Sequence, residues 1–182
     1  MIGMDMIPLN EEERVENLKK YKILYTKPEP AFDQIAAIAA TMLNAPVAMI
    51  NFVDRYTVWT KANQNGESGF EQDRDICLCS LAILKDKVTV YEDLSKEMHL
   101  ISNPLIAGER GFKFYAAAPI TTNEGFNVGV VCVVDKTSRT FTEEEQKKLE
   151  WVASLIRTEM NKRIGLTKKN MAHSLVDLED NI

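Results

Sequence analysis

The sequence of 182 residues has few of the features that mark a metal site or a secreted protein. It holds two histidines, three cysteines and no Cys-x-x-Cys pair, so the ligand spacing of a zinc site is missing. No apolar run approaches the roughly 20 residues that span a bilayer, and the N-terminus lacks the basic and apolar regions of a signal peptide. These absences predict a cytoplasmic protein with no metal site and no membrane segment.

Positive charge is also not concentrated anywhere in the chain. The formal net charge is -5, and the lysines and arginines are spread among acidic residues. Domains that bind nucleic acid need a basic patch or stripe, so a nucleic-acid partner is not expected. Apolar residues make up 45% of the chain and charged residues 27%, which is typical of one soluble globular domain at this length.

The three cysteines allow two interpretations. Cys77 and Cys79 are two residues apart, and Cys132 lies in an apolar, strand-like run. In a reducing compartment such thiols are usually buried and pack as small hydrophobic groups. A redox pair of Cys77 and Cys79 is the alternative, but alternate positions of a helix point apart and a disulfide would need unwinding. The pattern therefore favours a structural role and predicts no catalytic residue.

Two helices are predicted near the N-terminus. Residues 10–22 begin with Asn10 and Glu13 at the spacing of a capping box, and carry acids first and bases last. Residues 32–43 repeat apolar side chains with a helical period. A short buried helix is expected later, at residues 76–84.

A long helix is predicted over residues 142–164. Thr142 and Glu145 have the spacing of a second capping box, and Gly165 has the position of a C-terminal stop. Residues 165–182 then form a weakly amphipathic tail. The helix carries a wide apolar stripe made of Leu149, Val152, Leu155, Ile156, Met160 and Ile164.

Five strands are predicted between these helices, at residues 47–53, 56–62, 88–91, 114–121 and 127–135. The first two read as a hairpin, and so do the last two. The order of helices and strands predicts an α+β fold around a mostly antiparallel sheet.

Two polar segments are predicted as loops. Residues 63–73 contain two glycines and read as an exposed loop. Residues 93–113 form a connection longer than compact domains usually tolerate without a function. This second segment is therefore expected to cover a pocket.

Several short runs follow one another in a characteristic order along residues 10–164. They are Asn10-Glu11-Glu12-Glu13-Arg14, Phe32-Asp33, Val53-Asp54-Arg55 with Trp59 and Lys61, Arg74-Asp75 with Cys79 and Ala82-Ile83-Leu84, Asp93, Asn103-Pro104-Leu105, Phe114-Tyr115-Ala116 with Ala118-Pro119, and Gly129 with Cys132-Val133-Val134-Asp135. In this order and spacing the chain resembles the GAF family. One step departs from the pattern of near relatives, because Cys79 is followed by Ser80 and Leu81 where a Cys-x-His step is common.

The resemblance implies an antiparallel sheet of five to six strands, with the terminal helices on one face and a loop-roofed pocket on the other. Family members sense cyclic nucleotides, bilins, other small metabolites or redox state, and many relay the signal through dimerised helices. The resemblance thus implies a GAF domain at residues 10–164, acting as a sensory or regulatory module and not as an enzyme. Its partners would be an unidentified small molecule, a second copy of the chain and a separate output protein.

The expected pocket residues are polar side chains on apolar segments: Asn51, Lys61, Arg74, Asp75, Cys79 and Tyr115. Lys61 and Arg74 flank the loop 63–73, which predicts that both face one cavity and favour an anionic or polar ligand. Each residue also has a structural interpretation. Asn51 can satisfy a strand end, Lys61 can extend to solvent, and Arg74 and Asp75 can cap the helix that follows.

The helix stripe of residues 142–164 is wider than one face of a sheet requires, so a second helix is expected to cover it. Val15 and Leu18, on one face of the helix at residues 10–22, make that helix the expected neighbour. This predicts a homodimer through residues 10–22 and 142–164, with the pocket on the opposite face of the sheet. Two other functions stay open: a thiol-based redox enzyme of the methionine sulfoxide reductase type, and a dimerisation unit without a ligand. The residues specify no cofactor.

Overall fold

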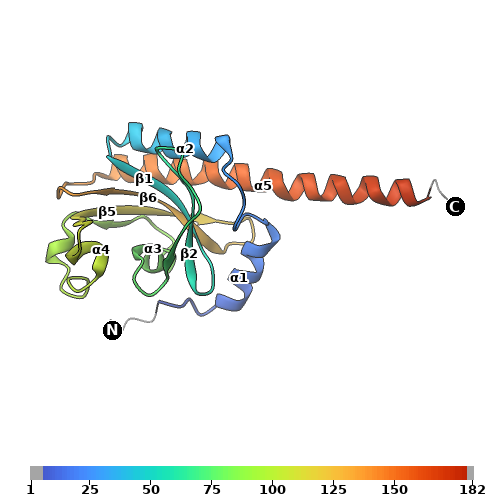
Figure 1. Ribbon diagram of the computed structural model, residues 1–182. Coiled ribbons are helices and arrows are strands. Elements are labelled where there is room, and N and C mark those ends of the chain that lie inside the picture. Colours follow the sequence, from blue (N-terminus) through green and yellow to red (C-terminus); the bar gives the residue numbers. More distant parts are fainter. Residues whose placement is uncertain (1–5, 180–182) are drawn as a thin grey trace.

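The computed structural model describes the backbone of residues 6–179 and the side chains of residues 6–165. A six-stranded antiparallel sheet with the strand order β3-β2-β1-β6-β5-β4 forms the centre of the fold (Figure 1). The strands are β1 (Val47–Val53), β2 (Thr57–Asn63), β3 (Phe70–Asp73), β4 (Thr89–Tyr91), β5 (Phe114–Thr121) and β6 (Asn127–Asp135).

Helices cover both faces of this sheet. They are α1 (Glu11–Lys20), α2 (Pro30–Met42), α3 (Leu78–Ala82), the 3-10 helix η1 (Leu94–Lys96), α4 (Pro104–Ala107) and α5 (Glu143–Glu179). In Figure 1, α2 and α5 lie side by side on one face, while α3 and α4 lie on the other. The fold is therefore the predicted α+β arrangement, with two separate cores.

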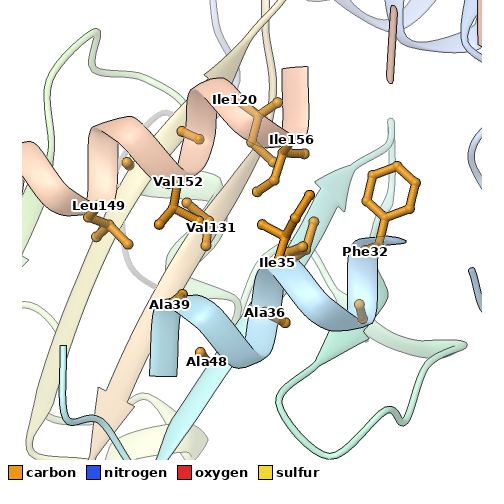
Figure 2. Close-up of a cluster of buried hydrophobic side chains, with 14 of the residues drawn as sticks. Phe32, Ile35, Ala36, Ala39, Ala48, Ile120, Val131, Leu149, Val152 and Ile156 are labelled. Carbon is orange, nitrogen blue, oxygen red and sulfur yellow. The ribbon is translucent and has the colours of Figure 1, made fainter. Parts of the chain in front are cut away.

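The larger core fills the face under α2 and α5. Figure 2 shows Val152 of α5 next to Val131 of β6, with Ile35 of α2 close to both, and all three are buried. Alternate residues of each strand point to opposite faces, so the neighbouring Val130 belongs to the smaller core under α3. Burying both faces explains why the central strands read as continuous apolar runs.

The five predicted strands are present, and β3 is an additional one. This strand lies in the segment predicted as an exposed loop. Its residues are mostly polar and exposed because it forms the outer edge of the sheet and pairs with β2 on one side only. A polar edge strand of four residues has no apolar alternation by which it could be found in the sequence.

The two predicted capping boxes have different outcomes. At the start of α5, the Thr142 amide donates to Glu145 at 2.8 Å and the Glu145 amide donates to the Thr142 hydroxyl at 3.2 Å, which confirms that box. Asn10 precedes α1, but its side chain makes no capping hydrogen bond.

The predicted stop at Gly165 is wrong, since α5 continues through this residue to Glu179. Gly165 does not adopt the positive φ of a helix C-terminal glycine. A single glycine inside a helix costs only about 1 kcal/mol relative to alanine, which its helix-forming neighbours offset. The tail predicted at residues 165–182 therefore begins as part of α5, and the side chains of its apolar repeat lie outside the described residues.

The expected pairing of α1 with α5 is also wrong. The helix beside α5 is α2 (Figure 1), whereas α1 packs mainly against β6. The segment 10–22 contacts α5 at its end, where Arg163 donates to the carbonyls of Tyr21 and Lys22. Val15 and Leu18 of α1 are fully buried, and no large apolar side chain of residues 10–22 is exposed. Most residues of the apolar stripe of α5, Ile156 among them, are buried in the core of the same chain.

Candidate functional site

The polar residues of the smaller core converge at one point beneath α3. Asn51 on β1, Tyr115 on β5 and Cys132 on β6 all point to this face of the sheet, and Cys79 of α3 lies over them. They come together because β1 and β5 both pair with β6, which places Met49 and Ala117 on either side of Cys132. Three of the predicted pocket residues, namely Asn51, Cys79 and Tyr115, therefore meet in one site.

Asn51 orients this site. Its Oδ1 accepts a hydrogen bond from the Thr60 hydroxyl at 2.8 Å, so its Nδ2 must face the sulfur atoms. Nδ2 lies 3.3 Å from Sγ of Cys79 and 3.7 Å from Sγ of Cys132. The amide of one buried side chain thus bridges two thiols.

Cys79 is the centre of the hydrogen-bond network. Hydrogen bonds from the Cys132 and Cys77 thiols hold the pKa of Cys79 well below its usual range, against the effect of burial, and the Tyr115 hydroxyl also donates to it at 3.5 Å. The pKa values of Cys77 and Cys132 are raised by the same hydrogen bonds to Cys79 and by burial. Cys79 is therefore the thiol of this cluster that most readily ionises.

The geometric objection to a contact between Cys77 and Cys79 is wrong. Cys77 precedes α3 in an extended conformation, with φ -86° and ψ 126°, and is not a helical residue. The alternation of helix positions therefore does not apply to Cys77, and both residues line the same cavity. All three cysteines are free and buried.

The cavity at this site is small, with a volume of about 30 Å³. The thiols line it together with side chains from the segment between α4 and β5, including Arg110 and Phe112. Pockets for drug-sized ligands measure roughly 300–1,000 Å³, whereas a water molecule needs only about 10–15 Å³ on this kind of measure. As folded here, the cavity has room for a molecule little larger than water.

Lys61 does not belong to this site. It follows Thr60 on β2 and therefore points to the other face, where it is fully buried beside the ring of Phe32. Its Nζ donates to the Thr26 hydroxyl at 2.8 Å, to the Lys27 carbonyl at 2.8 Å and to Glu29 at 2.6 Å. The alternative in which Lys61 extends to solvent is therefore wrong as well.

Arg74 and Asp75 lie at a third place, beside α1. Both residues line a groove of about 760 Å³. The Arg74 guanidinium binds the carboxylate of Glu11 and the carbonyl of Met6, and Asp75 is exposed. The prediction that Lys61 and Arg74 face one cavity is thus wrong, because different elements engage them on different sides of the sheet.

The carboxylates of Glu11 and Glu29 each join distant segments of the chain, and the sequence did not indicate either of these roles. Glu11 binds both Arg14 and Arg74. Glu29 binds Lys61 and, at 2.5 Å, Arg163 of α5. Only the Glu11 to Arg14 spacing is visible in the sequence, since the other partners lie more than thirty residues away.

The profile of the GAF domain matches residues 27–160, which is most of the chain. The chain belongs to the GAF domain family. A cyclic di-GMP phosphodiesterase of Pseudomonas aeruginosa is 30% identical over 150 residues, a match that covers 82% of this chain and 25% of that protein. The chain therefore spans a quarter of the length of this relative.

Solved structures show the same fold. The GAF domain of an Acinetobacter phosphoenolpyruvate-protein phosphotransferase has a TM-score of 0.62 at 13% identity, covering 86% of this chain and 95% of that one. The bacteriophytochrome RpBphP3 of R. palustris has a TM-score of 0.64 at 10% identity, and the match covers 94% of this chain and 42% of that one. A type II free methionine-R-sulfoxide reductase from Thermoplasma acidophilum has a TM-score of 0.56 at 15% identity, and the match covers 74% of this chain and 95% of that one. These likenesses concern the fold alone.

Two further observations concern the described part of the chain. No helix within it is long and apolar enough to cross a membrane. Within the same residues, no group of histidine, cysteine, aspartate and glutamate side chains is arranged to hold a metal ion.

Proposed function

We propose that this chain is a cytoplasmic sensory GAF module in which residues 10–164 respond to a small molecule at the Asn51, Cys79 and Tyr115 site and α5 carries the response onward. The supporting observation is that this buried polar site lies on one face of the sheet, while α5 lies on the other face and extends beyond the sheet (Figure 1). A reducing compartment suits the three free cysteines. The output would lie in a separate protein or in further sequence. The phosphodiesterase to which the chain is similar is a much longer protein, of which the match covers 25%.

A continuous set of contacts connects the two faces. Asn51 bonds to Thr60 on the pocket side of β2, and the next residue, Lys61, bonds to Glu29 on the α5 side. Glu29 in turn binds Arg163, near the end of the part of α5 that packs on the sheet. A shift of β2 at the pocket would therefore move the anchor of α5.

The proposal is tested by screening small polar metabolites for a shift in Tm, followed by hydrogen exchange of α5 with and without a binder. We expect the binder to lose its effect in Asn51→Leu, which keeps a side chain of similar size but no amide. Binding that is unchanged by this variant, or that leaves α5 exchange unaltered, would contradict the proposal.

Glu29→Gln is expected to leave the binding of a small molecule intact while it weakens the effect of that molecule on α5. The neutral amide weakens the anchor of both Lys61 and Arg163, whereas the pocket lies on the other face. The Tm shift caused by a binder should persist while the change in α5 exchange falls. Glu159→Gln is the matched control, because Glu159 pairs with Lys162 on α5 itself. An equal loss in both variants would contradict the route through Glu29.

We also propose that the homodimer forms through α2 and α5. Ile38, Met42 and Trp151 are apolar yet 39%, 36% and 49% exposed on these neighbouring helices. A groove of about 400 Å³ lies beside Met42 and Trp151, and its rim carries Glu144 and Lys148. Glu144 and Lys148 pair with each other on α5, so the patch presents exposed apolar groups beside a neutralised ion pair, and a second copy related by a two-fold axis can cover it with the same surface. The continuation of α5 beyond the sheet also favours a partner helix, since isolated helices of this length are marginal in water.

Trp151→Glu is expected to convert this dimer into a monomer. Large aromatic side chains at the centre of an interface commonly contribute about 2 kcal/mol or more to binding, and a buried unpaired charge adds to the loss. Sedimentation at micromolar concentration measures the change. Tyr56→Glu is the control, because Tyr56 is an exposed aromatic residue outside both helices. A monomeric parent, or a dimer that survives Trp151→Glu, would refute this surface.

A further inference from the structure

The cysteine cluster has properties that packing alone does not require. Three buried thiols meet at one cavity, and within this mostly apolar core two polar groups, the Asn51 amide and the Tyr115 hydroxyl, donate to the sulfur of Cys79. We propose that Cys79 and Cys132 form a reversible disulfide when a peroxide enters this cavity, so that a small oxidant is the molecule sensed. The effect of the disulfide on α5 rests on the function proposed above, whereas the chemistry of the thiols does not.

Cys132 is the partner that the geometry favours. Its sulfur and that of Cys79 share one donor, Nδ2 of Asn51, at 3.7 Å and 3.3 Å, and both thiols line the same small cavity. Cys79 belongs to α3 and Cys132 to the central strand β6. A bond between these two residues joins separate elements that face each other across the cavity, whereas a bond between Cys77 and Cys79 would have to close a very short loop of backbone at the start of α3.

The surroundings of Cys79 suit the reacting thiolate. The hydroxyl of Tyr115 and the amide of Asn51 both donate to its sulfur, which stabilises the negative charge. No histidine is needed for this, so the missing Cys-x-His step does not remove the means of activation. The thiolate is the species that attacks peroxides and disulfides.

The size of the cavity selects the oxidant. A volume of about 30 Å³ admits a molecule of the size of water, and hydrogen peroxide is only slightly larger. A free amino-acid sulfoxide has many more heavy atoms and would require the segment between α4 and β5 to move away. The dimensions therefore favour a peroxide over the substrate of a methionine sulfoxide reductase.

The reaction balances with hydrogen peroxide as the oxidant. The Cys79 thiolate attacks one peroxide oxygen, the O–O bond breaks, and the leaving hydroxide takes a proton to become water, which leaves a sulfenic acid on Cys79. The Cys132 sulfur then attacks the Cys79 sulfur, the S–O bond breaks, and the hydroxyl leaves with the thiol proton as a second water. Both cysteines are oxidised and the peroxide is reduced. A cellular dithiol restores the two thiols by exchange.

The test uses the full chain, reduced and then treated with a small molar excess of hydrogen peroxide. We expect the intact mass to fall by two hydrogen atoms, and peptide mapping without reductant to recover Cys79 joined to Cys132. A later addition of dithiothreitol should restore the reduced mass. Mapping of the unaltered chain avoids any dependence on the folding of a variant.

Variants then identify the partner. Cys132→Ala and Cys79→Ala should abolish the disulfide, whereas Cys77→Ala should still form it, although more slowly, because the Cys77 thiol no longer helps to stabilise the Cys79 thiolate. Tyr115→Phe should slow its formation, because one donor to the Cys79 sulfur is removed. Recovery of a Cys77 to Cys79 link, oxidation only to sulfinic acid, or no oxidation before the chain unfolds would each overturn the proposal. If the disulfide forms but α5 exchange is unchanged, the proposed relay fails and the thiol chemistry stands.

Discussion

Replacing Glu11 with glutamine is expected to destabilise the domain by about 3–5 kcal/mol, the usual cost of breaking a buried ion pair from one side. The Glu11 carboxylate receives two hydrogen bonds of 2.8 Å from Arg14 and is also bound by Arg74. Both arginines are almost fully buried, and Arg14 also donates to the Val53 carbonyl at 2.6 Å. A neutral amide would leave two buried guanidinium groups without a counter-charge.

Urea denaturation of the two proteins measures this loss as a change in midpoint. Glu12→Gln is the matched control, since Glu12 is the next residue of α1 and pairs with Arg55 at the exposed surface. Exposed pairs contribute between about 0 and 1 kcal/mol, so the control should be close to the parent. Equal effects of the two substitutions would show that the Glu11 cluster does not hold α1 on the domain.

The same cluster should give the parent a specific loss of stability in acid. Burial would raise the pKa of Glu11, but hydrogen bonds from Arg14 and Arg74 outweigh it and hold the pKa below the ordinary value of 4.5. Above that value the folded state gains from the ionised carboxylate, and the gain is lost as pH falls through the lowered pKa. Denaturation midpoints measured as the pH is lowered from 4.5 should therefore converge for the parent and Glu11→Gln.

The helices and strands of the core could be predicted because burial imposes a period on the sequence. Strands β5 and β6 were placed at their observed bounds, since each is a run of apolar residues between polar turns. The exceptions are elements that burial does not control. β3 is a polar edge strand, and α5 passes Gly165 at a place where an added Cβ would meet no neighbouring element within 4 Å.

Of the candidate site, the sequence could predict the polar residues whose strand position turns them toward a buried face. Asn51 and Tyr115 are polar residues in buried strands, and a polar group in such a place needs a polar partner. Lys61 has the same appearance in the sequence, but its partner Glu29 belongs to the connection before α2. The partner that buries Arg74 is a glutamate 63 residues earlier in the chain. Such pairings depend on the tertiary fold, which local sequence does not contain.

The cysteines illustrate how a small shift of a helix boundary changes a chemical conclusion. A helix starting at residue 76 would point Cys77 and Cys79 apart. The helix begins at Leu78, so Cys77 keeps an extended backbone and the two thiols interact. Boundaries are the least reliable part of reading a sequence, and here one boundary decides whether thiol chemistry is geometrically allowed.

Gly129→Ala is expected to destabilise the domain by about 3 kcal/mol, the upper end of the usual range for an overpacked core. Gly129 lies opposite Phe52 where β6 pairs with β1 at the centre of the sheet. A Cβ atom there would stand 2.3 Å from the Asn51 carbonyl oxygen and 2.9 Å from Cδ1 of Phe52. The carbonyl is backbone in a paired strand and cannot rotate away, so the two central strands must separate.

The separation should also disturb the thiol site, because the crowded carbonyl belongs to the residue whose amide bridges Cys79 and Cys132. We therefore expect Gly129→Ala to lower the denaturation midpoint and, under conditions where it stays folded, to change the rate at which Cys79 reacts with a small alkylating reagent. Gly165→Ala is the opposite control: no atom lies within 4 Å of its added Cβ, and alanine in place of a helical glycine stabilises by roughly 0.5–1 kcal/mol. The two substitutions add the same methyl group, so opposite signs of their effects would assign the loss at residue 129 to the close approach of β1 and β6. A stable Gly129→Ala protein with unaltered Cys79 reactivity would mean that these strands relax without moving Asn51.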